Sequence, residues 1–376
     1  MEIPVPELSL YFILFSVYAL AFIDQLIYYW LIFGRLAFYK SKKRNKKPLP
    51  VSVVICARNQ DYNLKKYLPK ILEQDYPDFE VVVVNDSSTD ESLQILEDFG
   101  RKYPHLSIVN IEQNLNFFTG KKFPLALGIK SAKNELLLLT DPDCEPGSNN
   151  WIHQMASTFT NKTEIVLGYS PIKQAKGFLN TLMRFDNFQT GIRYLSFALA
   201  KKTYRGIGRN LAYRKSLFYK SGGFISDYKL QSGDDDLFIN RVSTKKNTRV
   251  EIAADSLMHS EFIPSFSWWY RKKQLQLNTG KRYKTSTKFL RGKFRLSLLV
   301  FYGLLAALLI INYSILFVLG LFVLRLITQL IITKKCATIL SEHKLLLLSP
   351  LLELFILFLL MSVKVSNIFI KQNRWK

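Results

Sequence analysis

The sequence predicts an α/β domain with a doubly wound sheet, flanked at both ends of the chain by membrane-spanning helices. Three observations predict this arrangement. Short apolar runs alternate with helical stretches between residues 50 and 145, as they do in parallel sheets covered by helices. Long apolar segments occupy both ends of the chain. Polar or acidic clusters follow three of the predicted strands.

The chain has 376 residues, of which 48% are hydrophobic, together with a net charge of +23. This length suits one large domain or two ordinary ones. The apolar residues are concentrated at the ends. Residues 10–36 contain only Asp24, Gln25 and Arg35 as strongly polar residues and are long enough to cross a bilayer. We therefore predict an integral membrane protein whose residues 1–38 form an N-terminal transmembrane helix.

A dense basic block follows the first span, in the predicted linker 39–49, where residues 40–47 read KSKKRNKK. The positive-inside rule places this block in the cytoplasm, so we expect the N-terminus outside and the central domain on the cytoplasmic side. The block could also bind anionic lipid headgroups. Nucleic acid is not an expected partner, because the chain has no zinc-ligand spacing, aromatic RNA-binding motif or basic recognition helix.

The C-terminal part, residues 293–376, is predicted to hold transmembrane or interfacial helices. Residues 296–332 are apolar almost throughout and could form two spans hinged near Asn312. Residues 345–363 could cross once more, or form a re-entrant or interfacial segment broken at Pro350. The sequence leaves both alternatives open.

The central domain has a regular order of predicted elements. They are strand 51–56, helix 63–72, strand 81–84, a helix opened by a capping box from Ser88 to Glu91, strand 107–111, helix 120–132 and strand 136–139. Right-handed crossovers place the carboxyl ends of such strands on one rim of the sheet. We therefore expect Arg58, Asp86 and Asp141 to converge there.

The fourth strand ends in two aspartates, since residues 135–145 read ELLLLTDPDCE. Open α/β sheets bind ligands at this end of their strands. Asp141 and Asp143 would suit Mg²⁺ or Mn²⁺ shared with substrate phosphates, although the same pattern also occurs in turns that close a strand. The chain has no Walker A or GxGxxG sequence, and Gly120-Lys121-Lys122 is the nearest approach, so kinases and dehydrogenases are disfavoured.

Two further stretches carry candidate chemistry. Asp234, Asp235 and Asp236 directly precede an apolar helical start, where they could cap the helix or supply a general base. Residues 263–292 contain adjacent aromatic residues followed by a basic run, at 268–273, which predicts an amphipathic interfacial helix. A packed core helix is the alternative. Residues 178–205 are predicted to form loops whose hydrogen bonds select the substrate.

These motifs together resemble the family 2 glycosyltransferases, whose fold is called GT-A. The resemblance is carried by VSVVICARN, VVVNDSSTD, LLLTDPDC and GDDDL, over roughly residues 50–282. It implies a GT-A domain with a doubly wound mixed sheet at residues 50–262. It also implies a nucleotide-sugar donor, most often UDP-linked, a divalent cation (Mg or Mn) and transfer with inversion at the anomeric carbon.

The resemblance also implies roles for individual residues. Ala57, Arg58 and Asp86 would line the base and ribose pocket, and Lys121 and Asp141 would contact the donor. Asp143 would be the metal ligand, with Asp141 beside it. Asp235 would be the catalytic base, a role that Asp234 or Asp236 could share. The residues expected at the acceptor or membrane interface are Trp268, Trp269, Arg271 and Gln274.

One departure from the family bears on the product. Members that polymerise sugars carry Gln-x-x-Arg-Trp on the interfacial helix, whereas this region here reads RKKQL. We therefore expect transfer of one sugar to a lipid or lipid-linked acceptor at the membrane. The alternatives are a processive polysaccharide synthase, a nucleotidyltransferase, and a non-catalytic membrane subunit with the same fold.

Overall fold

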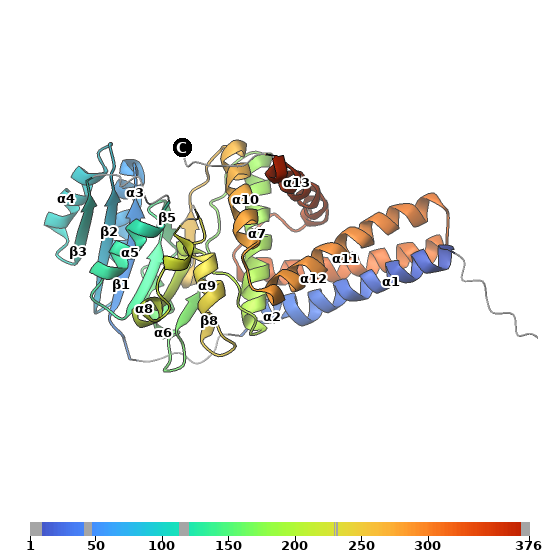
Figure 1. The fold of residues 1–376 in the computed structure, drawn as a ribbon, viewed down its shortest axis with the longest axis horizontal. Helices are drawn as coiled ribbons and strands as arrows, with labels where there is room; N and C mark the ends of the chain where they lie inside the picture. The colour runs from blue at the N-terminus through green and yellow to red at the C-terminus, as the bar shows by residue number, and fades with distance from the viewer. Residues whose placement is uncertain (1–9, 41–46, 113–119, 229, 231, 370–376) are drawn as a thin grey trace, which may run out of the picture.

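The computed structural model describes residues 10–40, 47–112, 120–228, 230 and 232–369. Most of the predicted basic linker, residues 41–46, lies outside these ranges. An α/β domain forms one end of the molecule, and three long helices project side by side from the other (Figure 1). The predicted combination of a doubly wound sheet and terminal apolar helices is confirmed.

The main sheet has seven strands in the order β3-β2-β1-β4-β7-β6-β8. Their bounds are β1 Val51–Ala57, β2 Phe79–Asp86, β3 Leu106–Ile111, β4 Leu136–Thr140, β6 Ile165–Leu167, β7 Leu211–Arg214 and β8 Thr248–Val250. The first four strands are parallel, and β7 runs antiparallel to both of its neighbours, so the sheet is mixed. A separate two-stranded sheet pairs β5 (Cys144–Pro146) with β9 (Met258–Ser260).

Helices cover both faces of the sheet because its strands are apolar on both faces. One face, which includes Val53 and Leu138, packs against α3, α4 and α6, and the other, which includes Val54 and Leu137, packs against α5, α7, α8 and α9. The bounds are α3 Asp61–Leu72, α4 Ser92–Lys102, α5 Lys122–Ser131, α6 Trp151–Ser157, α7 Phe178–Leu199, α8 Lys215–Lys220 and α9 Asp236–Val242. Short 3-10 turns are η2 Gly208–Asn210, η3 Ile225–Asp227 and η4 Ala254–Ser256.

The predicted loop at residues 178–205 is wrong, because most of it is the helix α7. This helix is buried on nearly all sides, and its buried residues include Arg184, Asp186 and Asn187. Sequence analysis detects a helix by the amphipathic period of its residues. A helix that buries polar residues among apolar ones does not show that period.

Four described segments are long and apolar enough to cross a membrane: Leu10–Ala37, Thr285–Ile310, Ile315–Ile339 and Ser349–Asn367. The first comprises α1 (Leu10–Ile27), the π-helical η1 (Tyr28–Phe33) and α2 (Gly34–Ala37). The others are α11 (Thr285–Ile310), α12 (Ile315–Ile339) and α13 (Ser349–Phe369). α13 is one continuous helix, so Pro350 lies in its first turn, where proline is tolerated, and does not break it.

Polar side chains inside these apolar helices pair with one another. Asp24 of α1 forms an ion pair with Lys293 of α11 at 2.6 Å. Arg325 of α12 forms an ion pair with Glu353 of α13 at 2.5 Å, and the Tyr29 hydroxyl donates to the same carboxylate at 3.0 Å. Unpaired charges are costly in an apolar environment, so these pairs fix how the helices pack.

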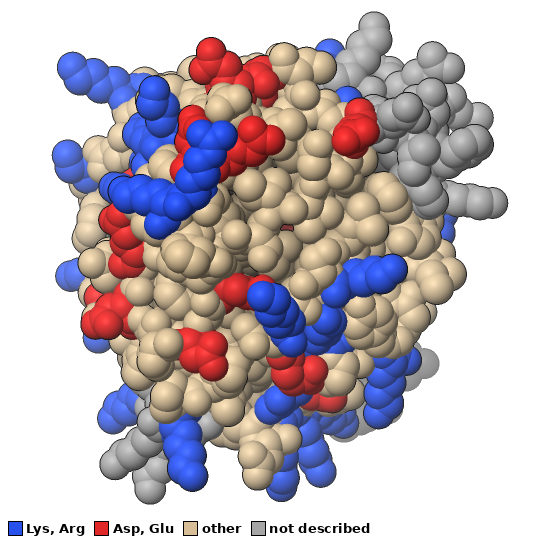
Figure 2. Space-filling model, turned by 90° about the vertical axis from the view of Figure 1, so that its left-hand side faces the viewer, with Lys and Arg blue, Asp and Glu red and all other residues tan. Residues whose placement is uncertain are grey.

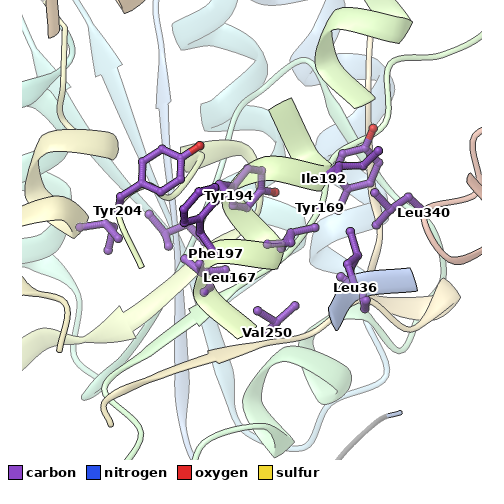
Figure 3. Close-up of a cluster of buried hydrophobic side chains, with 14 of the residues drawn as sticks. Leu36, Leu167, Tyr169, Ile192, Tyr194, Phe197, Tyr204, Val250 and Leu340 are labelled. Carbon is purple, nitrogen blue, oxygen red and sulfur yellow. The ribbon is translucent and has the colours of Figure 1, made fainter. Parts of the chain in front are cut away.

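The α/β domain and the apolar helices share one hydrophobic core. Figure 3 shows Leu36 of α2 and Leu340, which follows α12, beside Ile192 of α7 and Val250 of β8. The shared core therefore holds the α/β domain in a fixed position on the helices.

The end of the α/β domain farthest from the projecting helices carries basic and acidic side chains interspersed with uncharged ones (Figure 2).

Candidate active site

The carboxyl ends of the central strands bring the predicted donor residues to one rim of the sheet. Ala57 at the end of β1 is paired in register with Asn85 of β2, one residue before Asp86. Ile55 of β1 is paired with Thr140 at the end of β4, directly before Asp141. The predicted convergence of these three strand ends is therefore present.

The loops after β1 and β2 are joined by hydrogen bonds. The Asn59 N–H donates to Ser88 Oγ at 3.0 Å, and the Thr89 N–H donates to Asn59 Oδ1 at 2.8 Å. Arg58 lies 3.9 Å from the Asp86 carboxylate, whose pKa is raised by burial and lowered in part by that guanidinium. These hydrogen bonds hold the two loops together at the carboxyl ends of β1 and β2.

The Asp-x-Asp pair lies among basic side chains. Lys121, directly before α5, forms an ion pair with Asp141. Burial acts to raise the pKa of Asp141, but the Lys121 ammonium outweighs it and the net shift is downward. Burial and the neighbouring Asp141 raise the pKa of Asp143, and the charges of Arg209 and Lys272 oppose that rise. Burial and Arg209 lower the pKa of Lys272 to about 8.

These side chains fit a divalent cation that a substrate helps to bind. Among the described residues no group of three or more His, Cys, Asp or Glu side chains could hold a metal ion by itself. Within the residues that the structure describes, Asp143 forms no ion pair, and the neighbouring charge of Asp141 destabilises its ionised carboxylate. Mg²⁺ commonly takes one or two protein carboxylates and completes its coordination with phosphate oxygens and water. Two carboxylates at the rim therefore match the expected Mg or Mn.

Arg209 has no predicted role, and the structure places its charge beside Asp143. Its guanidinium donates to Asn187 Oδ1 at 2.9 Å and to the Ser260 hydroxyl. Its backbone carbonyl accepts from the Thr140 hydroxyl at 3.0 Å, at the end of β4. Since its partners come from α7 and β9, no local sequence pattern would reveal this position.

Asp235 is held by two backbone N–H groups. Its Oδ1 accepts from the Asp236 N–H at 2.7 Å as the N-cap of α9, and its Oδ2 accepts from the Gly208 N–H at 2.8 Å. Burial, followed by the charges of Asp234 and Asp236, raises the pKa of Asp235 to about 7. A carboxylate with such a pKa can both accept and release a proton near neutral pH.

The other two aspartates of this motif have different surroundings. Asp236 accepts from the Tyr283 hydroxyl at 2.5 Å and from the Thr279 hydroxyl at 3.2 Å, so it ties α9 to the end of α10. Asp234 lies near Lys121 and Lys122, whose charges partly offset the rise in its pKa that burial causes.

Lys122 is a buried residue that fixes the loop before this motif. Only 1% of its surface is exposed, and its ammonium donates to the carbonyls of Leu230 at 2.5 Å and Ser232 at 2.7 Å. Burial lowers its pKa. The adjacent lysines at the start of α5 therefore connect the Asp-x-Asp turn, through Lys121, with the loop before Asp234.

The predicted interfacial residues lie on α10 (Phe266–Gly280), and they point in different directions. Trp269 is 3% exposed and donates through Nε1 to Asp186 at 3.1 Å, and Gln274 is 3% exposed and donates to Ser366 of α13 at 3.3 Å. Trp268 and Arg271 are exposed. The helix α11 begins at Thr285, within the predicted interfacial segment 263–292.

Parts of the sequence are similar to known glycosyltransferases. Residues 52–222 match the family described as glycosyl transferase family 2. The chain is 28% identical over 267 residues to a probable glycosyltransferase, YdaM, of Bacillus subtilis, covering 68% of this chain and 60% of that one. It is 33% identical over 122 residues to a poly(ribitol-phosphate) beta-glucosyltransferase of Bacillus spizizenii, covering 32% and 19%.

A solved structure shares the fold over nearly the whole chain. It is the mannosyltransferase PcManGT from Pyrobaculum calidifontis in complex with GDP-Man and Mn²⁺, with a TM-score of 0.62 and 18% identity. The match covers 96% of this chain and 99% of that one. Residues 52–222 are therefore similar to a family 2 glycosyltransferase domain, and the chain has the GT-A fold of that structure. The sequence matches span 60% or less of the length of both relatives named above.

Proposed function

We propose that this protein is an inverting, metal-dependent glycosyltransferase that moves a sugar from a nucleotide-sugar donor to a lipid or lipid-linked acceptor at the cytoplasmic face of a membrane. The observation that supports the proposal is that Arg209, whose charge acts on Asp143, directly follows Gly208, whose N–H donates to Asp235. The family match supports glycosyl transfer as the reaction class.

The donor would lie across the rim of the sheet. Ala57, Arg58 and Asp86 would contact the base and ribose, and Lys121 and Asp141 would contact the donor beyond them. Both UDP-linked and GDP-linked sugars are candidates, because the resemblance favours UDP whereas the structural neighbour is described with GDP-Man. Both donors present the diphosphate group that the basic side chains near Asp143 would bind.

The protein's own groups would act on both sides of the reacting carbon. A divalent cation held by Asp143, with Asp141 beside it, would neutralise charge on the departing diphosphate. Arg209 and Lys272 would stabilise the same charge through fixed positive groups. Asp235, ionised near neutral pH, would take the proton from the acceptor hydroxyl as that hydroxyl attacks from the opposite face of the sugar.

The acceptor and the orientation follow from the apolar helices and their flanking charges. The site lies on a domain that shares its core with helices long enough to cross a membrane. The basic block at residues 40–47 supports the cytoplasmic side for the catalytic domain. Transfer of one sugar is favoured over polymerisation, because α10 lacks the Arg-Trp pair of the processive members.

The experiment is a donor screen with purified protein in detergent and added membrane lipid. Release of nucleoside diphosphate is measured for a panel of nucleotide sugars with Mn²⁺ or Mg²⁺. We expect release from one donor, lost in Asp143→Ala and retained in the matched control Asp61→Ala, an acidic residue at the start of α3. Failure of every donor to bind, measured by calorimetry, would refute the proposal and favour a non-catalytic membrane subunit.

A further inference from the structure

Four arginine side chains from α7, from the segment after α7 and from the first turns of α11 lie near one another. They are Arg193 on α7, Arg205 after α7, and Arg291 and Arg295 on α11. Within the described ranges, no ion pair or hydrogen bond involves their guanidinium groups, and the Nε atoms of Arg193 and Arg205 are buried without a partner. Arg205 is only 9% exposed. Buried charged groups in proteins are normally paired, so this arrangement calls for a ligand.

The four side chains form one continuous group. Arg295 is close enough to Arg291 and Arg193 for their positive charges to repel it. Arg193 and Arg205 both act in the same way on Lys273 of α10, which is itself paired with Asp186. Repulsion between these positive charges destabilises the protein when no ligand is bound, and an anion that binds among them relieves it.

Aromatic rings hold one of these guanidinium groups in place. The guanidinium carbon of Arg291 lies 5.1 Å from the centre of the Tyr204 ring and 5.0 Å from the centre of the Tyr283 ring. Tyr283 in turn donates to Asp236 at 2.5 Å. A guanidinium that lies against aromatic faces keeps its N–H donors available at its edge, where they can bind a phosphate in pairs.

One short segment connects this group to the donor site. Arg205 lies near Asp235, the Gly208 N–H holds the Asp235 carboxylate, and Arg209 lies beside Asp143. Basic side chains are therefore present on both sides of Asp235, one set beside the expected diphosphate and the other toward the membrane. The apolar run of α11 begins at Leu296, directly after Arg295.

We propose that the arginine cluster, formed by Arg193, Arg205, Arg291 and Arg295, binds the phosphate group of a lipid-linked acceptor and places the acceptor hydroxyl beside Asp235. This inference rests on the proposed function. A phosphate monoester or diphosphate carries about two negative charges or more, which matches several guanidinium groups better than the single charge of a phosphodiester headgroup. The start of the apolar helix at the cluster suits a ligand whose remaining part stays in the lipid.

Binding of dodecyl phosphate to the full-length protein in a non-ionic detergent tests this inference. The wild type should bind it saturably, and the double variant Arg291→Gln/Arg295→Gln should bind at least about tenfold more weakly. Lys288→Gln removes an exposed charge from the same helix, and its affinity should stay within about twofold of the wild type. Equal binding by the double variant and the wild type would overturn the assignment.

Two competitors distinguish the possible sources of the phosphate. Neither inorganic phosphate nor phosphatidylglycerol should displace dodecyl phosphate at equal concentration. Displacement by phosphatidylglycerol would assign the cluster to a membrane headgroup, and displacement by inorganic phosphate would assign it to a free anion; either result would overturn an acceptor site. Nucleoside diphosphate binding with Mn²⁺, measured on each variant, controls for folding. Its absence in the wild type would refute the proposed function, whereas loss of dodecyl phosphate binding alone would not.

Discussion

Replacement of Asp235 by asparagine separates the proposed base from its structural surroundings. Asparagine has nearly the same shape and is as good an N-cap as aspartate, so α9 should still begin at this point. It offers one acceptor oxygen where Asp235 uses two, for the Asp236 and Gly208 N–H groups. One weakened hydrogen bond costs about 1 kcal/mol, and removal of a charge that Asp234 and Asp236 repel offsets part of that cost.

The effect on catalysis should be much larger than the effect on stability. Loss of a general base reduces the rate by about 100-fold to 10,000-fold, or ~3 to 5 kcal/mol in activation free energy. The assay is steady-state sugar transfer, together with calorimetric binding of the nucleoside diphosphate, which should remain within about twofold. Asp234→Asn is the matched control in the same motif and should retain most activity. Wild-type turnover in Asp235→Asn, or an equal loss in Asp234→Asn, would refute the assignment of the base to Asp235.

Three other perturbations test separate parts of the site and fold. First, kcat/KM should rise as the pH increases through about 7, because Asp235 must lose its proton to act as base. The KM for the donor should increase at pH values above about 8, because Lys272 loses its charge there. Values of kcat/KM and KM that do not change from pH 6 to 9 would contradict both expectations. Second, Glu342→Leu should lower the unfolding free energy by about 3 to 5 kcal/mol, because the buried Arg184 guanidinium, which lies 2.9 Å from Glu342, loses its ion pair. The double variant Arg184→Met/Glu342→Leu should recover much of the lost melting temperature. If the melting temperature did not recover, loss of the ion pair would not be the cause. Third, Gly128→Ala should destabilise by about 1 to 3 kcal/mol, because its Cβ would lie 2.7 Å from Val54 Cγ1 and 2.9 Å from Val84 Cγ2; Gly292→Ala, where the added Cβ meets no atom within 4 Å, is the control.

The parallel half of the sheet could be predicted because its strands are apolar at consecutive positions and end abruptly in polar residues. Val81–Val84 and Leu136–Leu139 are buried on both faces, and each is followed by the residues that form the rim. The order of these strands along the chain then fixes which ends meet. Backbone topology therefore brought Asp86 and Asp141 to the predicted place without any knowledge of side-chain contacts.

At the start of α4, the sequence motif correctly predicts that a helix begins, but the hydrogen bonds that it predicts are different from those in the structure. The predicted capping box from Ser88 to Glu91 is not formed, and the Ser92 N–H instead donates to Asp90 Oδ1 at 3.0 Å. Ser88 accepts from Asn59 in the neighbouring loop. The Ser88 hydroxyl therefore binds a loop that is distant in the sequence, and a local sequence pattern does not predict such a contact.

The same reason explains why Arg209, Arg205 and Arg291 were not assigned roles from the sequence. Arg209 is held by groups of α7 and β9, and Lys272 lies beside Asp143 although α10 is more than a hundred residues away in the chain. Arg205 and Arg291 come together through the packing of α11 on the α/β domain. Contacts between distant segments are set by the tertiary fold, and hydrophobic periodicity carries no information about them.

The most direct test of the account is transfer of a labelled sugar into lipid. Purified protein is incubated with the labelled nucleotide sugar found in the donor screen, Mn²⁺ and a membrane lipid extract, and the organic phase is counted. The account predicts label in the organic phase that depends on the divalent cation, is lost in both Asp143→Ala and Asp235→Asn, and persists in Asp61→Ala. Label that remains entirely in the aqueous phase while the nucleotide still binds would contradict a lipid or lipid-linked acceptor.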